Sequence, residues 1–144
     1  MTFRNVWTDA DFAEMGWHDA VVYSMTFPQA DFVIRFDVDY IFQWHWTDKN
    51  IRGWDVAPCT LEFLNVSNLQ VALDWQMQGD TSIQDITRQN SRPSPNGKFT
   101  LWDYRVELDV GNIGFSATGF TQTARTPPTF STSQSLGRRF QIVK

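Results

Sequence analysis

The sequence predicts an all-β fold of mainly antiparallel strands, either a β-sandwich or one strongly curled sheet, with at most one short helix near the N-terminus. One observation behind this prediction is the aromatic content of twelve Phe, seven Trp and three Tyr, because large rings suit the half-buried surface of a sheet. The other is that apolar and polar residues alternate over several segments, as in strands with one buried face. A chain of 144 residues fits one domain spanning residues 1–144.

The first expected elements are a short helix and a strand. Thr8 followed by Asp11 resembles a capping box, in which side chains at a helix start bond the free backbone N–H groups. We therefore expect two helical turns over residues 9–15, ended by Gly16. The apolar period then changes to two, which predicts a strand over residues 21–27.

The longest alternation runs over residues 32–46, where eight large apolar side chains occupy every second position. An extended segment of this length would reach about 50 Å, well beyond the usual strand. The segment must therefore bend, bulge or extend past the core. We expect residues 32–40 to form a core hairpin with the strand at 21–27, joined by a turn at 28–31. Residues 42–46 keep two interpretations, core or exposed surface.

Loops and strands alternate through the rest of the chain. We expect loops where Gly, Pro and Asn cluster, over residues 47–58 and 88–98. Residues 82–88 are ambiguous, since their isoleucines lie three apart in a short segment. Gly111-Asn112 is a tight-turn signal, and we expect the tail around Pro127 to be an extended cover. The remaining alternations predict strands over residues 60–64, 69–75, 102–110 and 113–117.

The charge and the N-terminal sequence narrow the classes of partner. A net charge of −4 with scattered basic residues argues against nucleic acid as a partner, because binding it needs a clustered basic field. The same charge favours a protein partner of basic charge.

No stretch of eighteen apolar residues exists, so we expect no membrane segment. The N-terminus lacks a signal-peptide pattern and Cys59 is the single cysteine, so we expect a reduced, cytoplasmic compartment.

Trp17, His18 and Asp19 form the first candidate binding site. An imidazole beside a carboxylate can act as a general base or as a metal ligand. The alternative is structural, because adjacent side chains on an extended chain point in opposite directions. In that interpretation Trp17 packs in the core and His18 bonds the backbone.

Asp37 and Asp39 form the second candidate, on the polar face of the long strand. Side chains two apart on one face lie roughly 7 Å from each other, within the range of paired catalytic carboxylates. The alternative is a solvated outer face that discourages edge pairing. Arg105, Glu107 and Asp109 repeat this pattern, which favours the solvated face in both places.

Trp44, His45, Trp46 and Trp54 form the third candidate. Their rings could stack on a sugar, anchor a protein partner or fill the core. His45 could bind a metal together with His18 and a carboxylate if the hairpin ends meet. The sequence has no nucleophile motif and no Gly-rich phosphate loop. We therefore predict no catalytic residue, no metal and no cofactor.

A family resemblance rests on motifs from three parts of the chain. They are Trp17-His18-Asp19 with the long strand from Asp31 to Tyr40, Pro58-Cys59-Thr60-Leu61-Glu62-Phe63 with Asn65-Val66, and Ala117-Thr118-Gly119-Phe120-Thr121-Gln122. Together they resemble a group of small bacterial β-rich domains of unknown function, which are similar to the immunity proteins that accompany bacterial toxins. The likeness covers most of the chain from residue 17 onward and brings no catalytic residues with it. The resemblance implies a non-catalytic cytoplasmic binder.

Three functional hypotheses follow. The first is an interaction protein, of the immunity-inhibitor kind, that caps a partner with acidic strand faces and exposed aromatic side chains. The second is a carbohydrate-binding β-sandwich with Trp44, Trp46 or Trp54 as stacking rings. The third is a small hydrolase or metal-dependent enzyme built on His18, His45 and nearby aspartates.

Overall fold

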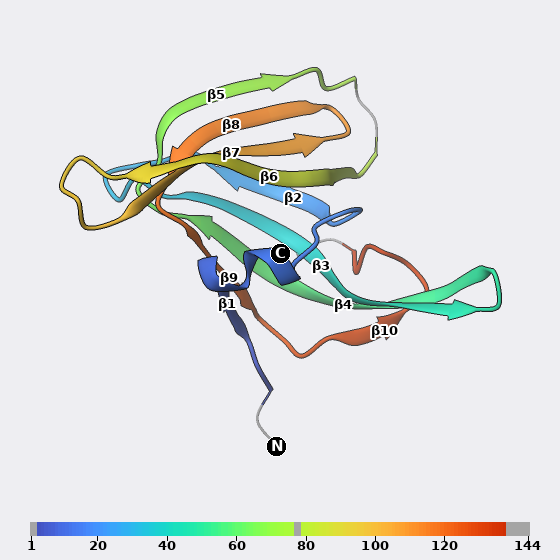
Figure 1. The fold of residues 1–144 in the computed structure, drawn as a ribbon. Coiled ribbons are helices and arrows are strands. Elements are labelled where there is room, and N and C mark those ends of the chain that lie inside the picture. Colours follow the sequence, from blue (N-terminus) through green and yellow to red (C-terminus); the bar gives the residue numbers. More distant parts are fainter. Residues whose placement is uncertain (1–2, 77–78, 138–144) are drawn as a thin grey trace, which may run out of the picture.

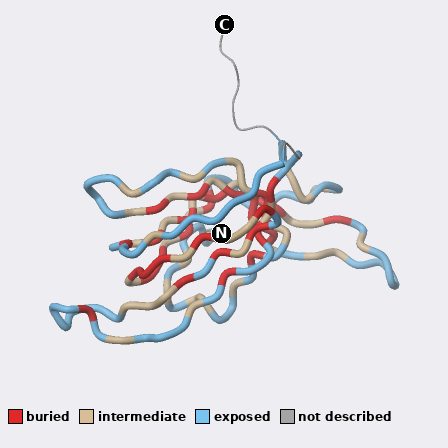
Figure 2. The backbone as a smooth tube through the Cα atoms, turned by 90° about the horizontal axis from the view of Figure 1, so that it is seen from above, coloured by how far each residue is buried: buried red, intermediate tan, exposed pale blue. Residues whose placement is uncertain are grey.

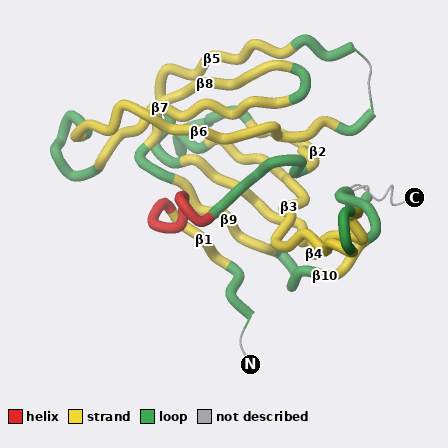
Figure 3. The backbone as a smooth tube through the Cα atoms, turned by 45° about the vertical axis from the view of Figure 1, so that its right-hand side comes forward, coloured by secondary structure: helices red, strands yellow, loops and turns green. Residues whose placement is uncertain are grey.

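The computed structural model describes residues 3–76 and 79–137. Their ten strands form one antiparallel sheet in the order β1-β9-β4-β3-β2-β6-β7-β8-β5, with β10 added on β4 (Figure 1). The elements are β1 (Val6–Thr8), the 3-10 helix η1 (Asp9–Glu14), β2 (Val21–Thr26), β3 (Ile34–Thr47), β4 (Asn50–Phe63), β5 (Ser67–Leu73), β6 (Thr81–Pro93), β7 (Thr100–Leu108), β8 (Gly111–Ala117), β9 (Phe120–Ala124) and β10 (Thr129–Ser131). The all-β prediction is confirmed, and η1 is the one helix of the described residues (Figure 3).

The sheet curls so that its two halves face each other. One half holds β1, β9, β4, β3, β2 and β10, and the other holds β6, β7, β8 and β5. The halves join where β2 pairs with β6 through two residue pairs. Across the gap, the Phe63 ring of β4 lies 5.0 Å from Tyr104 and 4.8 Å from Phe115 between centroids. The fold is therefore a strongly curled sheet with a sandwich-like core, and Figure 2 shows the buried segments along the middle of the strands.

The expected helix start is present, although the helix is shorter and tighter than expected. The Thr8 backbone N–H donates to Asp11 Oδ2 at 2.9 Å, as a capping box requires. η1 follows β1 directly, and β1 is a short strand that the sequence pattern did not reveal.

The first hairpin is confirmed, since β2 pairs antiparallel with β3. Ile34, Phe36 and Val38 of β3 are fully buried. Phe32 departs from the expectation, because it has a φ of 58° and lies in the turn with its ring exposed. The long strand also bulges as expected, with register shifts between Ile41 and Gln43 and between His45 and Trp46.

The loop expected over residues 47–58 is wrong. β4 starts at Asn50 and pairs with β3 along its whole length, with only a short turn between them. This ladder overrides the poor strand propensity of Gly53 and Pro58. Pro58 is tolerated because it lies between the stretches of β4 that pair with β10 and with β9, where its missing N–H leaves no ladder bond unmade.

The loop expected over residues 88–98 is also wrong in its first half. β6 continues to Pro93, and Arg88 and Arg92 pair with Tyr104 and Leu101 of β7. This end of β6 is mostly exposed, so its sequence lacks the apolar alternation by which a strand is recognised. Residues 82–88, whose sequence pattern is ambiguous, also belong to β6, because they too are held by pairing with neighbouring strands.

The hairpin of β7 and β8 is confirmed, but its turn is not at Gly111-Asn112. Leu108 pairs with Gly111, so the two turn residues are Asp109 and Val110. Gly111 follows the turn with a φ of 141°, a conformation that L side chains rarely adopt. The expected tail cover also contains short strands, β9 and β10.

Two core tyrosines, Tyr40 and Tyr104, and the half-buried Tyr23 are expected to make the fold sensitive to alkali. Burial raises the pKa of the Tyr104 hydroxyl from 10.0 to about 12, and burial also raises the pKa of Tyr23 and of Tyr40. The unfolded chain therefore loses these protons at a lower pH than the folded chain does, so the stabilisation present below about pH 10 is lost as pH rises toward 12. Urea unfolding at pH 8, 10 and 11 should show a falling free energy of unfolding. In the Tyr104→Phe variant, the free energy of unfolding should fall less as pH rises. An equally large fall in that variant would contradict the contribution of the Tyr104 hydroxyl.

Candidate functional site

The end of the β3–β4 hairpin extends beyond the rest of the sheet (Figure 1). We call residues 42–55 the arm. β3 pairs with β2 no further than Asp39, and β4 pairs with β9 no further than Cys59. In the described chain the arm is therefore a two-stranded ribbon, apart from the contact of β10 with β4 at Trp54 and Asp55. Phe42 at the base of the arm packs against the central core, and the aromatic residues beyond it do not belong to that core.

Burial along β3 falls steadily from the core toward the tip of the arm. Phe42 is half-buried and packs between Tyr40 and Trp7, with ring centroids 4.8 and 5.0 Å away. Trp44 is half-buried as well, whereas Trp46 is 63% exposed. Phe42 therefore packs against the core, Trp44 is partly covered, and Trp46 lies on the surface.

One face of the arm gathers three rings. Trp44 and Trp54 face each other across the ladder and meet edge to face, with centroids 5.8 Å apart at 75°. The exposed His18 imidazole stacks over Trp44 at 6.5 Å and 16°, and its Nδ1 lies 3.1 Å from the Gln84 carbonyl oxygen. His18 therefore contacts the backbone, as its structural interpretation predicts.

The opposite face of the arm holds the second histidine. His45 Nε2 lies 2.8 Å from Asp55 Oδ1, and its ring is 5.3 Å from that of Phe130. The Arg52 guanidinium lies 5.1 Å from the Phe130 centroid, in a cation–π contact. Since consecutive strand residues face opposite sides, His45 points away from Trp44 and His18.

The two histidines are therefore not brought together. Among residues 3–76 and 79–137, no group of three or more His, Cys, Asp and Glu side chains could hold a metal ion. Trp17 is buried in the core, where its Nε1 donates to Gln122 Oε1 at 2.8 Å. Asp19 has a φ of 68°, which brings its Oδ2 to 3.5 Å from His18 Nε2. The expectation that these neighbours point apart fails because the chain is not extended at Asp19.

Asp37 and Asp39 have different surroundings. Asp37 forms an ion pair with Arg125 at 2.6 Å, on the polar face that the sequence predicts. Asp39 is 0% exposed, so the solvated-face prediction is wrong for this residue. Its Oδ2 accepts the Tyr23 hydroxyl at 2.6 Å and the Leu136 N–H at 2.7 Å. The segment after β10 therefore covers this position, which the local strand pattern could not reveal.

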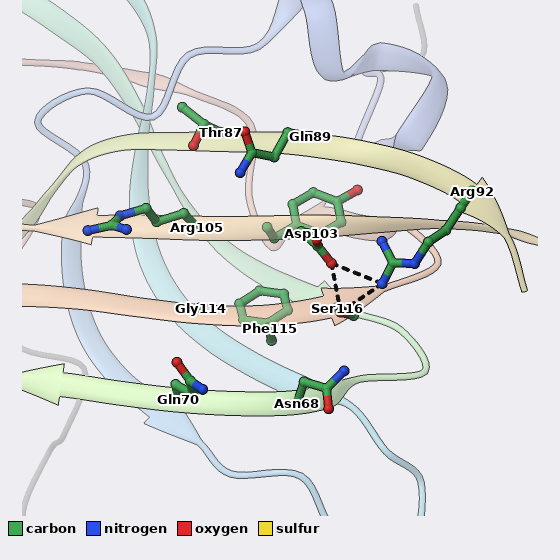
Figure 4. A pocket seen from close by; sticks show the side chains of 11 residues that line it. Asn68, Gln70, Thr87, Gln89, Arg92, Asp103, Arg105, Gly114, Phe115 and Ser116 are labelled. Carbon is green, nitrogen blue, oxygen red and sulfur yellow. Dashed lines mark hydrogen bonds and ion pairs between the residues drawn. The ribbon is translucent and has the colours of Figure 1, made fainter.

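A polar groove of about 540 Å³ crosses the outer face of β5, β8, β7 and β6 (Figure 4). Ser116 Oγ donates to Asp103 Oδ1 at 2.8 Å, and Arg92 pairs with the same oxygen at 3.0 Å. Hydrogen bonds from Asn90 and Ser116, together with Arg92, lower the pKa of the Asp103 carboxyl. The remaining polar lining consists of Asn68, Gln70, Thr87, Gln89 and Arg105.

The sequence does not predict this groove, because it predicts a loop over residues 88–98. One signal in the sequence does indicate it: polar residues occupy every second position, at Thr87 and Gln89 and again at Asp103 and Arg105. Its aromatic lining residues, Tyr104 and Phe115, are buried and belong to the core. The groove therefore offers hydrogen bonds without a stacking ring, and water satisfies such groups well. It has the character of a hydrated sheet face.

No protein family, curated protein or solved structure matches this chain. None of the helices in the described residues is long and apolar enough to cross a membrane. The candidate site thus rests on geometry alone, and the arm combines the exposed Trp46 ring with a ribbon that extends beyond the core.

Proposed function

We propose that this chain is a non-catalytic protein-binding domain that contacts its partner through the arm. The observation that carries the proposal is the exposed indole of Trp46 on a ribbon that projects beyond the core. Phe130 of β10, also exposed, lies beside the arm. Buried aromatic anchors dominate the free energy of protein interfaces, and an exposed ring at a projecting tip can reach a pocket on another protein.

The backbone of the arm supports the same proposal. β3 beyond Asp39 pairs with β4 on one side, and no described strand pairs with its other side. Such an edge presents N–H and C=O groups to which an extended segment of a partner can add as a further strand. A two-stranded ribbon is also only marginally stable by itself, so an added strand would stabilise the arm.

The nature of the partner follows from charge and from the family resemblance. A net charge of −4 favours a basic partner, because complementary charge raises the association rate and selects among partners. We place the protein in the reduced cytoplasm, in the role of an immunity-like inhibitor of a bacterial toxin. That role stays a prediction whose support is the motif resemblance.

The alternative functions have weaker support. The hydrolase hypothesis needs His18 and His45 in one site, and they lie on opposite faces of the arm. The carbohydrate hypothesis has the exposed Trp46 ring in its favour, but Trp44 and Trp54 meet edge to face and do not offer sugars a shared flat platform.

Affinity capture with the tagged full chain tests the proposal. Trp46→Ala should reduce recovery of a specific partner at least tenfold, while the free energy of unfolding changes by less than about 0.5 kcal/mol, as is usual for surface positions. Phe27→Ala is the matched control, since Phe27 is 58% exposed and lies off the arm. Equal recovery with both variants would contradict docking through the arm, and selective retention of glycans would favour the second hypothesis.

A further inference from the structure

A small apolar cavity opens where β2 separates from β6. The two strands pair only through Val21 with Ser82 and Val22 with Thr81. Beyond these pairs lies a cavity of about 160 Å³. Apolar cavities of roughly 150 Å³ hold a benzene-sized group, so one large apolar side chain would fit. Its apolar walls include Val22, Met25, Phe36, Leu73, Val110 and Ile113.

The entrance of this cavity carries exposed apolar side chains. Trp75 is 53% exposed and Leu73 is also exposed, and both line the cavity. Leu73 is the last residue of β5 and Trp75 follows it in the chain, and β5 is the edge strand at one end of the sheet. A partner that covers them would remove a large indole and an isobutyl group from water, which favours association.

A buried hydroxyl points to the same place. Thr81 lines the cavity and is only 5% exposed. Its Oγ1 is buried and has no hydrogen-bond partner among the described residues. Buried hydroxyl groups normally have a partner, because an unmade hydrogen bond destabilises the folded state. An occupant with a polar group beside its apolar side chain could supply the missing bond.

Three acidic residues adjoin lining residues of the cavity in the chain. Asp74 lies between Leu73 and Trp75 in the sequence, Asp80 precedes Thr81, and Asp109 precedes Val110. All three carboxylate residues are exposed. The one basic residue next to a lining residue in the chain is Arg35, beside Phe36, and it is paired with Asp31 and Glu62. The segments 73–75, 80–81 and 109–110 therefore bring apolar side chains to the cavity and carry negative charge beside them.

We propose that this cavity docks one large apolar side chain of a basic segment in a partner protein. The apolar side chain would fill the cavity, and flanking Lys or Arg residues would face the three carboxylates. This site goes beyond the proposed function of the arm and does not depend on it, because the cavity and the arm involve different residues. A peptide that binds the cavity would support this proposal even if arm variants lost no partner.

Titration of the ¹⁵N-labelled full chain with blocked pentapeptides tests the proposal. The probe is Lys-Lys-Leu-Lys-Lys, compared with Lys-Lys-Gly-Lys-Lys and Glu-Glu-Leu-Glu-Glu. The leucine peptide should shift the amide signals of Leu73, Thr81 and Val110 at millimolar concentration or below. The other two peptides should bind at least tenfold more weakly, because one lacks the apolar group and the other is repelled by the carboxylates.

Charge-reversal variants provide the matched comparison. Asp74→Lys and Asp80→Lys should each weaken binding of the leucine peptide at least threefold, whereas Asp48→Lys at the arm tip should change it by less than twofold. The dispersed amide spectrum of each variant shows that it is folded. Absence of shifts, equal affinity for the leucine and glycine peptides, or shifts confined to the arm would each overturn the proposal. Concentration-dependent shifts of the same amides without peptide would also overturn it, in favour of a second copy of the chain.

Discussion

Phe63→Ala is expected to reduce the free energy of unfolding by about 3–5 kcal/mol, the usual range for a large aromatic residue removed from a core. Phe63 is 0% exposed. Its ring contacts both halves of the curled sheet, with Phe36 and Phe120 at 6.1 Å on one side and Tyr104 and Phe115 on the other. Truncation would leave a cavity that the surrounding strands can fill only in part.

The measurement is urea unfolding followed by tryptophan fluorescence and far-UV circular dichroism. Phe27→Ala is the control, because it removes the same atoms from an exposed ring and should change the free energy of unfolding by less than about 0.5 kcal/mol. Similar losses in the two variants would mean that the halves of the sheet do not meet at Phe63.

Gly111→Ala is expected to cost about 2–4 kcal/mol, for a steric and a conformational reason. A Cβ at this position would overlap the Ala72 carbonyl oxygen and lie 3.0 Å from Leu73 Cα. The φ of 141° is also unfavourable for an L side chain. Since Leu73 pairs with Gly111, the added methyl group should also release the end of β5 from β8.

Gly16→Ala is the matched control, because no atom lies within 4 Å of the Cβ that it would add. Urea unfolding should separate the two variants by at least about 2 kcal/mol. Hydrogen exchange should become faster in β5 and β8 of Gly111→Ala while β3 and β4 keep their protection. Uniformly faster exchange would contradict a local release of β5.

The elements that the sequence predicts well are those with local signals. The Thr8–Asp11 cap and the first hairpin depend on residues that are close in the sequence, and alternation marks one buried face directly. The extent of β4 is not predictable in this way, because its outer half has few apolar residues to bury and is held as a strand by pairing with β3. Strands that exist because of a partner rather than their own pattern cannot be recognised locally.

The candidate site shows the same division. Alternation and composition single out Trp44, Trp46 and Trp54 in the sequence, and all three lie on the arm of the folded chain. The contact of His18 with Trp44 and the burial of Asp39 by the segment after β10 join residues far apart in the chain. Neither could be read from spacing, because loop geometry decides which distant segments meet.

Site-specific photo-cross-linking tests the central claim, docking through the arm, most directly. A benzophenone amino acid would replace Trp46 in one version of the full chain and Phe27, which is similarly exposed, in another. Both would be irradiated in cells of the source organism. The account predicts one discrete protein adduct from position 46 that is absent from position 27 and is lost when Trp44→Ala is added. No adduct from position 46, or the same adduct from both positions, would contradict it.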